Sequence, residues 1–434
     1  MTLTGRTRAL LYASSVDTRR RDYDGASSPS RVAAQLAALN VEWTRVTQTV
    51  PYYRRLVAGG QLPASFASLE EFATRVPVTT RADVQSGLAE RTSTGRSPDF
   101  RRMTGGSTSE PVQLPAWSSE NVFTRADTWW ARSWYGITPA SRLYLLWGHS
   151  HLLGTGTMGW VRARRMELSD LLLGYHRQSA YDMRPEKLVE AADALIRFRP
   201  DYVIGYSVAL ARFAAVNEGR RQALRALGLK AVVGAAEAFP TPESAERLGD
   251  LFGCPVGMEY GSVETGLIAH TEPGSDYRVF WRSYLVEAER RGAVWRLAVT
   301  SLYPRCFPLI RYDIGDEVTL AEGSADTVIG LTRIARVAGR CNDYVSLNDG
   351  TVLHSEVFTH AVRPCRDVKA YQIVQGGGAV RVDYLADAPL SEEAAAAIRE
   401  RLRRVHPSLA AIPLSRVDDL RRTIAGKTRM VITA

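Results

Sequence analysis

Residues 202–260 alternate between short apolar runs and longer amphipathic segments, and this alternation constrains the fold more than any other feature. The expected elements are strands at 202–206, 231–234 and 255–260, and helices at 207–228 and 241–253. Ser207 has a side chain suited to a helix N-cap, and Pro242 suits the first turn of a helix. A strand–helix–strand–helix–strand unit implies a parallel sheet, which gathers ligands at the carboxyl ends of its strands.

The pattern changes after about Arg340. Two strand-like runs, 368–375 and 379–384, flank three glycines and predict a hairpin. Ser391 then caps an expected helix, and 414–417 is a further strand candidate. This part of the chain reads as a small α+β unit.

Upstream, residues 30–60 and 118–135 carry apolar residues at helical spacing. A chain of 434 residues is too long for one small core. We therefore expect an α/β protein with a large N-terminal domain of parallel and mixed sheets at 1–339. A small, mobile α+β domain is expected at 340–434.

The formal net charge of +9 raises the question of nucleic acid binding, but the basic residues are scattered along the chain. Four of the 55 basic residues are lysines and the other 51 are arginines. Such a composition is typical of a GC-rich genome, so no nucleic acid partner is expected. The rarity of lysine also makes any lysine in a motif more informative.

No run of about 18 apolar residues occurs, so no membrane partner is expected. The N-terminus lacks the features of a secretory signal, and the sequence predicts a cytoplasmic protein. The four cysteines are widely spaced, without a CxxC pair. His149 and His151 have no third ligand in view, so we expect them to line a pocket and not to bind a metal.

Thr104, Gly105, Gly106, Ser107 and Thr108 open a loop that is dense in small hydrogen-bond donors. Such a loop can bring backbone N–H groups and hydroxyls onto phosphate oxygens. It lacks the Gly-Lys-Ser/Thr ending of a Walker A loop. Taken alone, it is equally typical of a surface turn.

A second motif, Glu-Tyr-Gly-Ser-Val-Glu-Thr-Gly at 259–266, lies at the carboxyl end of the last strand expected in the parallel sheet. Its Glu264 could hold Mg²⁺, which prefers carboxylate and phosphate oxygens. A solvated loop glutamate is the alternative.

Three further segments lie downstream. Asp316 closes the segment Leu-Ile-Arg-Tyr-Asp-Ile-Gly-Asp at 309–316 and could accept both ribose hydroxyls. Gly-Arg-Cys-Asn-Asp at 339–343 lies at the expected domain boundary. Near the C-terminus, Lys427 is one of the four lysines and lies in a Gly-Lys-Thr-Arg segment.

The order and spacing of these five segments resemble the motif series of the adenylate-forming superfamily, in particular its phenylacetate–CoA ligase branch. The segments at 50–55 and 75–84 resemble the N-terminal region of that branch. The resemblance covers nearly the whole chain. It implies ATP- and Mg²⁺-dependent activation of a carboxylic acid as its acyl-AMP, in a biosynthetic or related role.

The resemblance also implies a role for individual residues. Thr104, Gly105, Gly106, Ser107 and Thr108 would wrap the ATP phosphates. The rest of the nucleotide would contact Ala236 and Glu237 at the adenine, Tyr260 and Gly261 near the base, and Asp316 with Arg340 at the ribose. Glu264 would bind Mg²⁺, and Lys427 would bridge the substrate carboxylate and the α-phosphate. Asn342 would be the hinge of the small domain.

The acid would lie near Trp147, His149, His151 and Gly234. The aromatic and histidine side chains favour a medium-sized acid over a long fatty chain, with aromatic and polar acids among the candidates.

The sequence departs from the usual motifs at Ser109, Val263 and Asn342, which leaves the second half-reaction open. One hypothesis is transfer to a thiol, either coenzyme A or a carrier protein. A second is transfer to an amine or another small nucleophile. A third, of a different class, is a non-catalytic nucleotide-binding protein that has decayed from the fold, against which the intact Glu264, Asp316 and Lys427 argue.

Overall fold

A computed structural model describes most of the chain. The described residues are 3–103, 113–148, 156–180, 182–241, 243–291, 294–320, 327–337, 344–362, 364–376, 379–421 and 430–433. They divide into two compact units. The first unit comprises the described residues up to 103, 113–141 and 255–337, and the second comprises those of 142–254 and 344–433.

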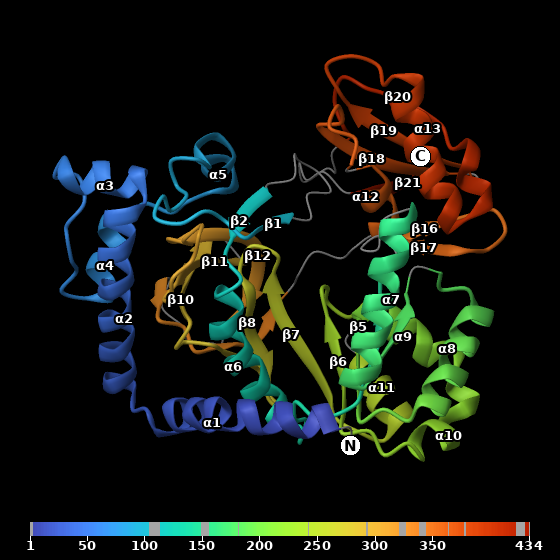
Figure 1. Ribbon diagram of the computed structural model, residues 1–434, viewed down its shortest axis with the longest axis horizontal. Coiled ribbons are helices and arrows are strands. Elements are labelled where there is room, and N and C mark those ends of the chain that lie inside the picture. The colour runs from blue at the N-terminus through green and yellow to red at the C-terminus, as the bar shows by residue number, and fades with distance from the viewer. Residues whose placement is uncertain are drawn as a thin grey trace. The chain divides into compact units, whose positions relative to one another are not determined.

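The first unit contains six helices, two antiparallel groups of strands and a short ribbon among its described residues (Figure 1). One group has the order β13-β10-β11-β12-β15, and the other has the order β14-β9-β8-β7. Their bounds are β7 Val256–Ser262, β8 Gly266–Thr271, β9 Tyr277–Val279, β10 Tyr284–Arg291, β11 Val294–Ser301, β12 Tyr312–Thr319, β13 Thr327–Ile329, β14 Arg333–Ile334 and β15 Arg336–Val337. The ribbon pairs β1 (Phe100–Met103) with β2 (Gln113–Ala116).

The helices of this unit come from the N-terminal third of the chain. They are α1 Leu3–Gly25, α2 Ser28–Thr49, α3 Pro51–Ala58, α4 Leu69–Arg75, α5 Arg81–Gly87 and α6 Glu120–Ser133. The sequence predicted one helical stretch at 30–60, but α2 and α3 are separate. Val50 is extended (φ −106°, ψ 113°), because a residue before proline disfavours the helical region. Pro51 then opens α3.

The second unit begins with a parallel sheet of order β6-β5-β3-β4. Its strands are β3 Leu143–Trp147, β4 Tyr175–Ser179, β5 Tyr202–Tyr206 and β6 Ala231–Ala235. The helices are α7 Gly156–Leu173, α8 Pro185–Phe198, α9 Ser207–Val216, α10 Arg221–Arg225 and α11 Ser244–Phe252. The predicted parallel pairing of the strands at 202–206 and 231–234 is confirmed.

Two helix predictions need correction. The helix expected at 207–228 ends at Val216 and gives way to a 3₁₀ turn and the short α10. Ser207 is the first helical residue and not the N-cap, which is Tyr206. The helix expected from Thr241 begins at Ser244, whose hydroxyl accepts the Thr241 N–H at 3.3 Å.

The C-terminal part of this unit has its own sheet, of order β20-β19-β18-β21, and its own hydrophobic core. Its elements are β16 Tyr344–Ser346, β17 Val352–His354, α12 Glu356–Val362, β18 Ala370–Gly376, β19 Ala379–Leu385, α13 Glu392–Val405, β20 Leu414–Arg416 and β21 Val431–Thr433. The hairpin of β18 and β19 is confirmed. So is the Ser391 cap, whose hydroxyl accepts the Ala394 N–H at 3.2 Å. The predicted mixed α/β class is therefore confirmed.

None of the helices in the described part of the chain is both long and apolar enough to cross a membrane.

Asp127 of α6 anchors α1 from within the first unit. Its carboxylate is fully buried, accepts a hydrogen bond from the Tyr23 hydroxyl at 2.9 Å and pairs with Arg19 at 2.9 Å. It also accepts a short hydrogen bond from the Ser283 hydroxyl. Burial raises the pKa of Asp127, while the Arg19 charge acts in the opposite direction. Three distant segments thus converge on one buried acid.

We predict that Asp127→Ala lowers the free energy of unfolding by about 3–5 kcal/mol, because it leaves a partly buried guanidinium and two hydroxyls without their acceptor. Urea unfolding followed by circular dichroism measures this. The matched control is Asp17→Ala, since Asp17 pairs with Arg20 on the exposed face of α1 and should matter little. Equal losses in both variants would contradict the role of Asp127.

Candidate functional site

Two of the predicted nucleotide residues meet within the first unit. The Tyr260 hydroxyl, on β7, donates a hydrogen bond to Asp316 Oδ2, on β12, at 3.3 Å. The Tyr260 side chain is otherwise buried, whereas Asp316 is only half-buried. The tyrosine therefore orients a carboxylate that keeps access to solvent.

Glu264 lies in the turn between β7 and β8. The turn is braced by Ser262 and Thr265, each of whose hydroxyls accepts the backbone N–H of the other residue, at 3.0 and 3.2 Å. The side chain of Glu264 is 12% exposed, and its Oε1 lies 3.7 Å from Nη1 of Arg81. Val263, beside it, is 46% exposed. The turn thus presents a carboxylate near a guanidinium.

Arg81 is held in place by the segment before it. Thr80 and Asp83 form a capping box at the start of α5, of which Arg81 is the first residue. Thr79 forms a parallel bridge with Tyr312, donating its N–H to the Arg311 carbonyl at 2.9 Å and accepting the Asp313 N–H at 3.0 Å. The strand that carries Asp316 therefore also fixes the segment that carries Arg81.

Glu259, the residue before Tyr260 on β7, forms an ion pair that ties this strand to α6. Glu259 accepts two hydrogen bonds from Arg132 of α6, at 2.7 and 2.9 Å. Burial lowers the pKa of His270, and this effect exceeds the opposite effect of the Glu259 carboxylate 4.0 Å away. The His270 imidazole is therefore neutral at neutral pH. Its Nδ1 donates to the Thr271 carbonyl at 2.8 Å.

Gly261 is required by the backbone itself. A Cβ added there would lie 2.1 Å from the Gly266 carbonyl oxygen, because β7 and β8 shift register between Tyr260 and Gly261. The glycine of this motif thus permits a close backbone approach, whatever else it does.

The remaining described site residues belong to the second unit, at the carboxyl ends of its parallel strands. The Trp147 ring ends β3 and lies 4.2 Å from the Tyr206 ring, centroid to centroid. Gly234 is buried in β6, opposite Gly205 of β5. Just beyond β6, Ala236 has a left-handed φ of +70°. The buried Glu237 accepts the Val208 N–H of α9 at 3.3 Å.

The other predicted site residues lie outside the described residues. They are Thr104, Gly105, Gly106, Ser107, Thr108, His149, His151, Arg340, Asn342 and Lys427. Their roles therefore stay predictions.

The possible metal ligands around Glu264 are compatible with Mg²⁺, but they are too few to bind a metal ion through protein side chains alone. Among the residues that the structure describes, no group of three or more His, Cys, Asp or Glu side chains could hold a metal ion. Mg²⁺ commonly takes only one or two carboxylates and completes its shell with phosphate oxygens and water. A single carboxylate at a strand end fits that coordination.

Sequence reasoning overlooked two arginines beside this turn, Arg81 and Arg305. The side chain of Arg305 is 2% exposed and donates to the Glu264 carbonyl at 2.5 Å. It stands in the otherwise apolar and proline-rich run 302–310. A charged residue in such a run must find buried partners, and that signal could have identified it.

The fold is similar to that of CoA ligases of known structure. Over 94% of this chain, and 90% of the other, the structure resembles 2-hydroxyisobutyryl-CoA ligase in complex with 2-HIB-AMP and CoA, with a TM-score of 0.59 and 18% identity. An open conformation of that ligase matches with a TM-score of 0.56 and 18% identity, covering 93% of this chain and 92% of the other. At this level of identity the likeness shows a shared fold. The chain therefore has the fold of these CoA ligases.

The sequence comparisons are more limited. No family model matches the chain. Protein CapK of Staphylococcus aureus is 27% identical over 208 residues, which are 45% of this chain and 44% of CapK. The match thus spans less than half the length of this curated relative.

We predict that Gly261→Ala destabilises the protein by about 3 kcal/mol or more, because the added methyl group would collide with backbone that cannot move aside. Thermal unfolding measures this. Gly219→Ala is the control, since no atom lies within 4 Å of a Cβ there. Wild-type stability of the Gly261 variant would show that the strands can separate without cost.

Proposed function

We propose that this chain is an adenylate-forming ligase of the phenylacetate–CoA ligase type. It would activate a carboxylic acid, with aromatic acids among the candidates, as an acyl-AMP at the expense of ATP. The acyl group would then pass to a thiol, either coenzyme A or a carrier protein. The observation that carries the proposal is the hydrogen bond between Tyr260 and Asp316, two motif residues 56 positions apart.

The geometry supports a separate role for each described residue. The half-buried carboxylate of Asp316, held by Tyr260, can accept the two ribose hydroxyls. The turn at 262–265 can hold Glu264 toward Mg²⁺, which when bound offsets phosphate charge. Ala236 and Glu237 follow the strand end where an adenine would lie. The segments at Thr104–Thr108, Arg340 and Lys427 complete the proposal from the sequence.

The chemistry begins with two anions that repel each other. A carboxylate oxygen of the acid attacks the α-phosphorus, forms the acyl–phosphate bond and expels pyrophosphate. Lys427 would lie between carboxylate and α-phosphate and stabilise the charge that develops in the transition state. The thiol sulfur then attacks the acyl carbon, releases AMP and gives its proton to solvent.

The second step supports a mobile small domain. The acceptor needs the space that Lys427 uses in the first step, so we propose that the domain at 340–434 moves about Asn342 between the steps. A shared fold with a ligase whose structure contains both an acyl-AMP and CoA favours a thiol as the acceptor.

We predict that the purified protein exchanges pyrophosphate into ATP only when a suitable acid is present, and that Lys427→Ala reduces this exchange about 10²–10³-fold. The assay uses a panel of aromatic and short-chain acids, and AMP release is then measured with CoA or with an amine. Lys369→Ala is the control, because Lys369 pairs with Asp387 on the surface. No exchange with any acid would reject adenylation, and amine-dependent AMP release would reject the thiol acceptor.

We predict that Glu264→Gln raises the Mg²⁺ concentration needed for half-maximal exchange by about tenfold or more, since the neutral amide is a weaker ligand for a hard cation. Glu272→Gln is the matched control, because Glu272 is a partly buried glutamate that pairs with Arg278 and Arg333 beyond β8. If the two variants give the same magnesium titration as the wild type, Glu264 is not a metal ligand.

A further inference from the structure

A buried ionic cluster lies behind the Glu264 turn, and the proposed chemistry does not use it. We define it as Arg102, Glu120 and Arg305. Glu120 is 1% exposed and Arg305 is 2% exposed, so neither charge is solvated. Burial, together with the Arg305 charge, lowers the pKa of Arg102, although an arginine stays protonated at neutral pH.

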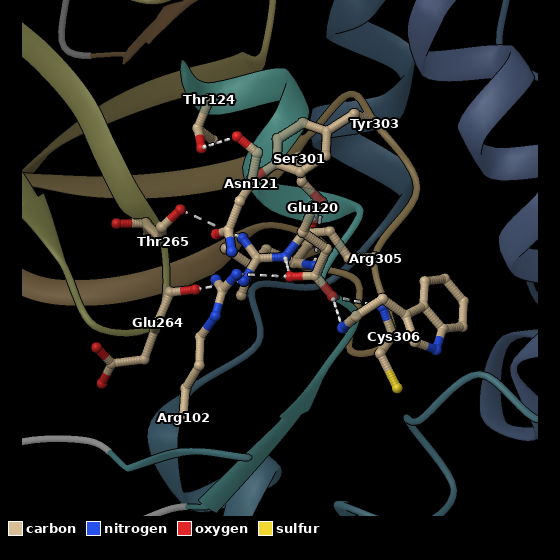
Figure 2. Close-up of polar contacts among 12 residues, drawn as sticks. Arg102, Glu120, Asn121, Thr124, Glu264, Thr265, Ser301, Tyr303, Arg305 and Cys306 are labelled. Carbon is tan, nitrogen blue, oxygen red and sulfur yellow. Dashed lines mark hydrogen bonds and ion pairs between the residues drawn. The ribbon is translucent and has the colours of Figure 1, made fainter. Parts of the chain in front are cut away.

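Glu120 is the centre of the cluster. Its Oε1 accepts the backbone N–H groups of Trp117 at 2.9 Å and Cys306 at 3.0 Å. Its Oε2 lies 3.0 Å from Nη2 of Arg102 and 3.6 Å from Nε of Arg305. Figure 2 shows the carboxylate between the two arginines. Glu120 thereby fixes both the backbone just after Arg305 and the direction of the Arg305 guanidinium.

Arg305 faces the turn with its other two nitrogens. Nη2 donates to the Glu264 carbonyl at 2.5 Å, and Nη1 donates to the Thr265 carbonyl at 3.4 Å. The Thr265 carbonyl also accepts a hydrogen bond from the Tyr284 hydroxyl at 2.6 Å. Among the described contacts, the donor to the Glu264 carbonyl is Arg305. The Glu264 carboxylate points away from the cluster (Figure 2).

We propose that Arg305, oriented by Glu120, is a positioning residue that holds the Glu264 carboxylate where it can meet the metal–nucleotide complex. In this turn the carbonyl and the side chain of Glu264 point in different directions, so a contact that holds the carbonyl also fixes where the side chain leaves the backbone (Figure 2). The planar fork of arginine can reach two carbonyls at once, and the ammonium of lysine cannot reproduce this geometry.

The same cluster also holds the strand that precedes the predicted phosphate loop. Arg102 lies in β1, two residues before Thr104, and its charge is paired with the same carboxylate. The cluster therefore couples the strand leading into that loop to the Glu264 turn through one buried acid. The positioning role of Arg305 rests on the proposed function, since that function is what makes Glu264 a ligand of Mg²⁺.

Arg305→Lys is the principal test, because it keeps a positive charge opposite Glu120. We expect the Mg²⁺ concentration for half-maximal pyrophosphate exchange to rise about tenfold or more, with a smaller change in the rate at saturating Mg²⁺. Amide hydrogen exchange in a peptide covering 259–267 should become faster in the protein without ligands. If Arg305→Lys does not fold, Arg305→Met takes its place, because Glu120 then keeps its ion pair with Arg102 and its two backbone N–H donors.

Arg278→Lys is the matched control. Arg278 also belongs to the first unit, pairs with Glu272 at 2.7 Å and donates to the Tyr23 carbonyl at 3.0 Å, but it does not contact the Glu264 turn. It should change neither the magnesium titration nor hydrogen exchange at 259–267. A wild-type magnesium titration and wild-type exchange at 259–267 in Arg305→Lys would overturn the positioning role, as would equal changes in the control.

The two proposals can fail separately. Absence of acid-dependent pyrophosphate exchange in the wild-type protein would reject the proposed function. Hydrogen exchange at 259–267 needs no activity, and it would still decide whether Arg305 fixes the turn.

Discussion

Buried ionic groups join segments of this chain that lie far apart in the sequence. Glu120 accepts hydrogen bonds from the backbone N–H groups of Trp117 and Cys306, which are 189 positions apart in the sequence. It also pairs with two guanidiniums. Arg311 does the same elsewhere, pairing with the buried Glu287 and donating to the carbonyls of Ala73 and Val76. A buried charge that loses its partner costs several kcal/mol, so each such group permits few arrangements of the loops around it. The first unit depends on this constraint, because the Glu264 turn and the start of the strand that carries Asp316 are among the segments held in this way.

Local patterns were sufficient to predict many of the elements. The Ser391 cap and the strands around the glycines at 376–378 carry their signals within a few residues, and both were found. The helix that begins at Ser207 was also found, but its N-cap was not, since Tyr206 is the N-cap and the Glu237 carboxylate accepts the Val208 N–H. Glu237 follows the next strand of the sheet. A cap supplied from 29 residues away leaves no mark in the local sequence, and tertiary contacts then outweigh intrinsic preference.

The candidate site shows the same division. Tyr260 and Asp316 were predicted from motif order, and the structure brings them together. Their meeting depends on β7 and β12, whose packing no short window of sequence encodes. Arg305 and Arg81 were overlooked because their partners, Glu120 and Glu264, lie 185 and 183 positions away. The sequence does carry a hint at Arg305, a charge within an apolar run, but it does not name the partner. Lys427 lies outside the described residues, so its role is still a prediction.

The discontinuity of the first unit has a practical meaning for recombining this protein with a relative. The chain leaves that unit near Ser141 and returns near Pro255, so 142–254 is an insertion in the topological sense. Thr79 forms backbone hydrogen bonds with the residues on both sides of Tyr312, and Asp127 accepts a hydrogen bond from the Ser283 hydroxyl. In each contact one partner precedes the insertion in the sequence and the other follows it. A chimaera with a single crossover near residue 141 would draw the two halves of these contacts from different parents. Exchange of 142–254 as a cassette, with one junction at each end, keeps them from the same parent.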